Sequence, residues 1–161
     1  QRGVAAAASA LMFLVNATRL AFWYTPGIWN RPLLWSLHAA FALITAGFLL
    51  HALTAVTSLN PALALHTLAV GGIGLVTLSM MARVSLGHTG RSVHAPPRIV
   101  LLPFALLLLA ALLRVLGPLF APAAYTTWIL LSQLGWIAGF AVFSVAWFPV
   151  LSRPRADGAP G

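Results

Sequence analysis

Long runs of apolar residues, separated by short polar segments, form the main pattern along the chain. A helix needs roughly 20 mainly apolar residues to cross about 30 Å of membrane hydrocarbon. The runs are continuous, whereas a membrane-spanning β-strand would alternate apolar and polar residues over roughly 10 positions. The pattern therefore predicts an all-α, polytopic membrane helix bundle with about five transmembrane helices, at residues 3–22, 33–53, 61–84, 99–116 and 125–150.

Proline, glycine and asparagine mark most of the breaks between these runs, because they favour turns and helix ends. The expected breaks are Pro26-Gly27, Asn60-Pro61, Pro96-Pro97, Gly117-Pro118 and Pro122. Residues 1–152 are predicted to form one transmembrane domain, and residues 153–161 a disordered cytoplasmic tail. The chain begins at Gln1 and has no initiator methionine, so we expect a fragment of a longer polytopic protein.

Composition supports a membrane protein and excludes several kinds of site. Of the 161 residues, 61% are hydrophobic and 6% are charged, whereas globular domains carry about a quarter charged residues. The chain has no cysteine, which excludes disulfides, thiolate metal ligands and cysteine nucleophiles. Its one acidic residue, Asp157, lies in the tail, so these spans hold no carboxylate for proton or sodium coupling.

The arginines predict the orientation of the bundle, because positive residues concentrate in cytoplasmic loops. Arg2 and Arg114 lie toward one predicted face, and the other face collects Arg19, Arg31, Arg83, Arg91, Arg98, Arg153 and Arg155. The C-terminus is therefore predicted to be cytoplasmic. This pattern explains the net charge of +8 without nucleic-acid binding.

Aromatic residues and glycines predict how the helices are anchored and packed. Amphipathic rings near span ends are expected to lie at the membrane interface, at Trp23, Trp29, Trp35, Tyr125, Trp128 and Trp147. Glycines within the spans are expected to mark close helix contacts, at Gly71, Gly72, Gly74, Gly135 and Gly139.

Five histidines are the main candidates for chemistry, because a neutral imidazole binds transition metals and haem iron. His51 ends the second span and His66 begins the third, and the short turn between them predicts one shared cofactor site near the outer face. His38, His88 and His94 fall on the predicted cytoplasmic side. The alternative is that these residues make interhelical hydrogen bonds or are solvated in loops.

Helical geometry limits which of these groups can cooperate. His38 and His51 are separated by about 220° around one helix and roughly 20 Å along it, so they cannot share a metal. On the third span, a rotation of about 100° per residue places His66, Thr77 and Met81 on one face. A methionine there could bind soft copper, or it could simply pack.

The segment from His66 to Arg91, HTLAVGGIGLVTLSMMARVSLGHTGR, resembles the signature region of the NnrS family. The similarity is strongest in ARVSLGHTGR, from Ala82 to Arg91, and extends more loosely through the second and third spans. The family comprises polytopic bacterial membrane proteins that are described as binding haem and copper and are associated with responses to nitric oxide. The resemblance implies the C-terminal portion of such a protein, in the bacterial inner membrane.

The resemblance implies a haem- and copper-binding protein involved in the nitric oxide response and in resistance to nitrosative stress. The candidate cofactor residues are His38, His51, His66, His88, Arg83 and Arg91, and the candidate metal ligands among them are His51, His66 and His88. The two arginines bracket the glycine-rich end of the motif and could hold a propionate or an anionic headgroup, or only form a positive cytoplasmic loop.

The expected partners are the lipid bilayer, haem, copper, nitric oxide and the other helices of the same protein. The alternative function is a permease-like transporter whose histidines line a pathway or stabilise helix packing without binding haem. No pattern identifies a catalytic residue, so we assign none.

Overall fold

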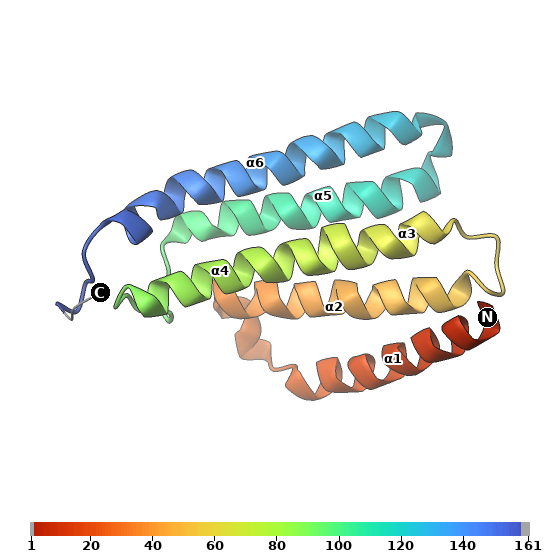
Figure 1. Cartoon of the computed structure of the whole chain (residues 1–161), viewed down its shortest axis with the longest axis horizontal. Coiled ribbons are helices and arrows are strands. Elements are labelled where there is room, and N and C mark those ends of the chain that lie inside the picture. The colour runs from red at the N-terminus through yellow and green to blue at the C-terminus, as the bar shows by residue number, and fades with distance from the viewer. Residues whose placement is uncertain (1, 159–161) are drawn as a thin grey trace.

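The protein folds into five helical spans that run antiparallel and pack side by side (Figure 1). The computed structural model describes residues 2–158. Across the bundle, the helices follow their order along the chain. The spans cover Gly3–Trp23, Pro32–Leu53, Pro61–His88, Arg98–Phe120 and Pro122–Ser152, and each is long and apolar enough to cross a membrane. The predicted all-α membrane bundle is confirmed.

The third span combines two α-helical parts with a π-helical segment between them. Short 3-10 turns precede the α-helices of the second, fourth and fifth spans. In chain order the elements are α1 (Arg2–Trp23), η1 (Pro26–Asn30), α2 (Pro32–Leu53), α3 (Pro61–His66), η2 (Thr67–Ile73), α4 (Gly74–His88), η3 (Arg98–Val100), α5 (Leu101–Phe120), η4 (Pro122–Ala124) and α6 (Tyr125–Ser152).

Proline begins several of these helices, because the first turn of a helix leaves its N–H groups unpaired in any case. At Pro61 the start is reinforced by Asn60, whose Oδ1 accepts the amide of Ala62 at 2.9 Å. The break predicted at Gly117-Pro118 is wrong, since α5 continues to Phe120. Pro118 lies in the last turn, where its missing N–H removes only one helical hydrogen bond.

Nothing in the hydropathy pattern predicts the π-helical segment η2. A π-helix bonds residue i to residue i+5, so the rotation of about 100° per residue does not hold across it. The face predicted for His66, Thr77 and Met81 is therefore wrong. His66 faces α5, whereas Thr77 and Met81 are exposed.

Glycines allow close contacts between the helices, as predicted. A Cβ atom on Gly72 would overlap Ile44 Cγ1 and would lie 3.2 Å from the Ile44 amide nitrogen. A Cβ on Gly139 would overlap Leu107 of α5. At Gly71, Gly74 and Gly135, an added Cβ would lie 3.1–3.3 Å from a neighbouring side chain. The absence of side chains at these positions brings the helix backbones together.

Trp147 is a core residue, and its predicted place at the membrane interface is wrong. Its side chain is 1% exposed and stacks on Phe143, with ring centroids 4.7 Å apart. Its indole N–H donates to the Ser85 hydroxyl at 2.7 Å, which ties α6 to α4. Nearness to a span end did not imply exposure, because α4 still packs beside α6 at this depth.

The ends of α4 and α6 are joined by arginine side chains. Arg91 Nη1 donates to the carbonyl of Val150 at 3.1 Å, and Arg155 Nη1 donates to that of His88 at 3.1 Å. Arg155 also forms an ion pair with Asp157 at 2.6 Å. Hydrogen bonding to this carboxylate, and then its charge, raises the pKa of Arg155.

Residues 153–158 lie against the end of α4, where the amide of Ala156 donates to the carbonyl of Thr89 at 3.0 Å. The disorder predicted for residues 153–161 stays a prediction, and positions 159–161 lie outside the described residues. The side chain of Arg2 is likewise outside them. The seven arginines predicted to share a face lie toward the end of the bundle where α1, α4 and α6 end (Figure 1). They are Arg19, Arg31, Arg83, Arg91, Arg98, Arg153 and Arg155. Which side of the membrane this end occupies stays a prediction.

Candidate functional site

His38 lines a cavity of about 520 Å³ beside α1, η1 and α2. Its side chain is half-buried, and its ring lies 5.9 Å from that of Tyr24, centroid to centroid. The cavity walls are mainly apolar, formed by Trp23, Ile28, Leu34, Leu37, Phe41 and Val76. An apolar pocket with one or two polar groups is the usual form of a site for an organic cofactor.

Arg19 lies next to two walls of this cavity. Its guanidinium carbon is 4.8 Å from the centroid of the Trp23 ring and 5.4 Å from that of Phe41. These distances are typical of cation–π contacts. The region therefore combines an imidazole, apolar surfaces and a nearby cation.

His51 lines a different cavity, of about 320 Å³, between α1 and the turn after α2. Its ring nitrogen Nδ1 is hydrogen-bonded to the Ser9 hydroxyl at 2.8 Å. The wall from α1 is formed by the small residues Ala5 and Ala6. A bond at Nδ1 orients an imidazole and leaves Nε2 free, as in many metal-binding histidines.

His66 faces the opposite side of the bundle, toward α5. Its Nε2 lies 3.4 Å from Arg114 Nη2, and because a guanidinium can only donate, Nε2 is the acceptor. The shared site predicted for His51 and His66 is therefore not formed. Equal depth in a hairpin does not make two side chains converge, and here one points to α1 and the other to α5.

The glycine-rich end of the motif forms the end of helix α4. Gly90 has a φ of +68°. The amide of Arg91 donates to the carbonyl of Leu86 at 2.9 Å, and the amide of Gly90 donates to the carbonyl of Gly87 at 3.3 Å. These bonds make a Schellman helix end, for which glycine is the favoured residue. His88, in the last turn, has an exposed side chain.

Arg83 and Arg91 face different neighbours. Arg83 lines a cavity of about 200 Å³ together with Arg31 and His94, whereas Arg91 bonds to the end of α6. His88 does not line the cavity at His38. The residues of the motif thus form a helix end and two separate polar contacts.

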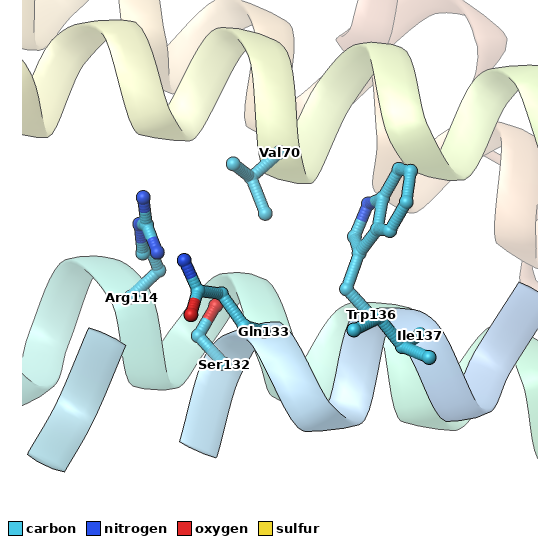
Figure 2. Close-up of a pocket in the computed structure, with 6 residues that line it drawn as sticks. All are labelled: Val70, Arg114, Ser132, Gln133, Trp136 and Ile137. Atoms are coloured by element: carbon cyan, nitrogen blue, oxygen red, sulfur yellow. The ribbon is translucent and has the colours of Figure 1, made fainter. Parts of the chain in front are cut away.

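A cavity near Arg114 was missed, because from sequence this residue was assigned only to a face of the membrane. The cavity has a volume of about 360 Å³ and lies between η2, α5 and α6 (Figure 2). Val70 forms one wall, and Ser132, Gln133 and Trp136 lie across from it. Gln133 could have been identified as a candidate site residue from the sequence, because it is a polar residue within an apolar helix.

Metal binding by the described residues would rest on few ligands. Within residues 2–158, no three side chains of histidine, cysteine, aspartate or glutamate converge on a point that could hold a metal ion. Haem needs only one or two protein ligands to its iron, so this finding bears on a bare metal ion more than on haem.

Comparison with known proteins identifies one family. Residues 2–155, nearly the whole chain, match the family model described as NnrS protein. No curated protein and no solved structure matches the chain. The match covers all five spans as well as the motif at the end of α4, and the chain therefore belongs to the NnrS family.

Proposed function

We propose that this chain is part of a haem- and copper-binding membrane protein that takes part in the response to nitric oxide and in resistance to nitrosative stress. Family membership supports the general role. The observation that carries the proposal is the apolar cavity of about 520 Å³ with His38 in its wall.

The residues around His38 fit a haem. The imidazole would hold the iron, the apolar walls would cover the macrocycle, and the guanidinium of Arg19 could pair with a propionate. The aromatic pair Trp23 and Phe41, with ring centroids 5.3 Å apart, would exclude water from the ring. A bound haem would supply an iron that takes up nitric oxide.

Copper fits the described residues less well than haem. His51 is the best single imidazole, because Ser9 orients its ring. His66 is a poor ligand, since the Arg114 guanidinium faces its Nε2 and would repel a second cation. Among the described residues, we propose no copper ligand other than His51.

Haem content of the purified protein tests the proposal. We expect the wild-type protein, produced with ample haem, to give a Soret band and a pyridine haemochrome, and the Soret band of the reduced protein to shift on addition of nitric oxide. His38→Leu should lose the native spectrum at an unchanged level of membrane-inserted protein. His94→Leu is the matched control, because the hydrogen bonds of His94 within the described residues are made by its backbone, whose carbonyl accepts from Arg31 and whose amide donates to the Ser92 hydroxyl.

Two outcomes would contradict the proposal. Wild-type protein without haem would exclude haem binding by the chain. A His38→Leu variant with native haem content and spectrum would exclude His38 as the ligand.

A further inference from the structure

Arg114 is a cation at membrane depth and has no acidic partner among the described residues 2–158. It lies six residues before the end of α5 at Phe120, or about 9 Å inward at 1.5 Å per residue. The one acidic residue of the sequence, Asp157, follows α6 at the opposite end of the bundle. Because an unpaired arginine in a membrane span is unfavourable, an anion from elsewhere would stabilise it.

The guanidinium points into the protein and does not reach toward the membrane surface. Its Nε is buried and has no hydrogen-bond partner within the described chain. Its Nη2 lies beside His66, which is a neutral acceptor in this contact. The guanidinium of Arg114 can therefore donate further hydrogen bonds to a ligand in the cavity of about 360 Å³ that it lines.

Further donors line the same cavity from α6. Gln133 lies eight residues after the start of α6 at Tyr125, about 12 Å inward, and so at a depth similar to that of Arg114. Ser132, with a side chain 1% exposed, and Trp136 flank it (Figure 2). The hydroxyl, the amide and the indole N–H can all donate hydrogen bonds. An acceptor-rich, negatively charged group complements this lining.

The charge and the walls define the kind of anion. One guanidinium balances one negative charge, so a monoanion fits better than a dianionic phosphate. A carboxylate accepts up to about four hydrogen bonds, in keeping with a guanidinium and several neutral donors. The remaining walls, Val70 and Ile137, are apolar and suit a hydrocarbon body.

We propose that this cavity binds the carboxylate of an amphiphile, with Arg114 as its ion-pair partner and Gln133, Ser132 and Trp136 as neutral donors. The carboxylate could belong to a long-chain fatty acid or to a tetrapyrrole. The site shares no lining residue with the cavity at His38, so either proposal can fail without the other.

Photolabelling in lipid nanodiscs tests the site. The probe is a palmitic acid that carries a diazirine and an alkyne, and mass spectrometry locates the labelled residues. We expect labelling at residues 132–137, suppressed by excess stearate and not by methyl stearate, which enters the bilayer but lacks the charge. Arg114→Gln should weaken competition by stearate about tenfold or more, as expected for loss of a charged hydrogen bond.

Two further variants control for misfolding and for general charge effects. Gln133→Leu keeps the guanidinium and should weaken competition several-fold. Arg98→Gln, at the opposite end of the same span, should leave labelling unchanged. Displacement of the probe at a much lower concentration of protoporphyrin IX than of stearate would identify a tetrapyrrole as the source, and the reverse order would identify a fatty acid. Suppression by methyl stearate as strong as that by stearate, or competition by stearate that is unchanged in Arg114→Gln, would overturn the proposal.

Discussion

A methyl group added at Gly72 tests the close contact between η2 and α2. The new Cβ would overlap Ile44 Cγ1 and would lie 3.2 Å from the Ile44 amide nitrogen. Rotation of the isoleucine side chain cannot clear its own backbone, so the helices must move apart. Overpacking of this kind typically costs about 1–3 kcal/mol, and alanine recovers up to about 1 kcal/mol through its helix propensity. We expect Gly72→Ala to lower the free energy of unfolding by about 1–2 kcal/mol.

Unfolding in mixed micelles with a rising fraction of SDS, followed by circular dichroism, measures this change. Gly87→Ala is the matched control, because it lies in the same span and a Cβ there would have no neighbour within 4 Å. We expect this control to be neutral or to stabilise by up to about 1 kcal/mol. In an Ile44→Ala background, Gly72→Ala should be less destabilising than in the wild type, because part of the overlap has been removed.

The reasoning would be refuted by a Gly72→Ala variant as stable as Gly87→Ala. Strict additivity of Gly72→Ala and Ile44→Ala would also refute it, since it would mean that the two positions do not touch.

Three other predictions concern the core, the tail and the orientation. Trp147→Phe should lower the free energy of unfolding by about 1–3 kcal/mol through loss of the buried hydrogen bond, whereas Trp29→Phe, at an exposed ring, should have little effect in the same SDS titration. Arg155→Ala should leave global stability unchanged but speed hydrogen exchange at the Ala156 amide, measured by mass spectrometry. A phosphatase–β-galactosidase reporter pair fused to the C-terminus should show β-galactosidase activity only, and phosphatase activity would reverse the predicted orientation.

The sequence predicted the number and approximate limits of the spans, because a helix that crosses the membrane hydrocarbon must be apolar over roughly 20 residues. It also predicted the close contacts at Gly72 and Gly139, since a missing side chain within a span has few other uses. The π-helical segment could not be predicted in this way. Hydropathy does not report whether a residue bonds four or five positions along the helix, and that difference depends on packing against α2 and α5.

The candidate sites were less predictable, because depth in the membrane can be read from a sequence but direction around a helix is less certain. His51 and His66 lie near the same end of the bundle, and yet they face different helices. His38 was identified as a candidate, but its cavity depends on the way α1 and η1 pack beside α2. Arg114 carried no signal beyond its charge, and its significance depends on Gln133, which comes from another span.

The π-helical segment makes the third span tolerant of a change in length at one place. A π-bulge is in effect one extra residue held within an α-helix. Deletion of a single residue from 67–73 could therefore restore ordinary α-helical bonding and keep the direction of every side chain beyond it. The same deletion in the first turn of α4, before Leu78, would turn the rest of the helix by about 100° and move Leu78, Ala82 and Leu86 out of the core. Among related chains, differences of one residue in the length of this span should accordingly fall in η2.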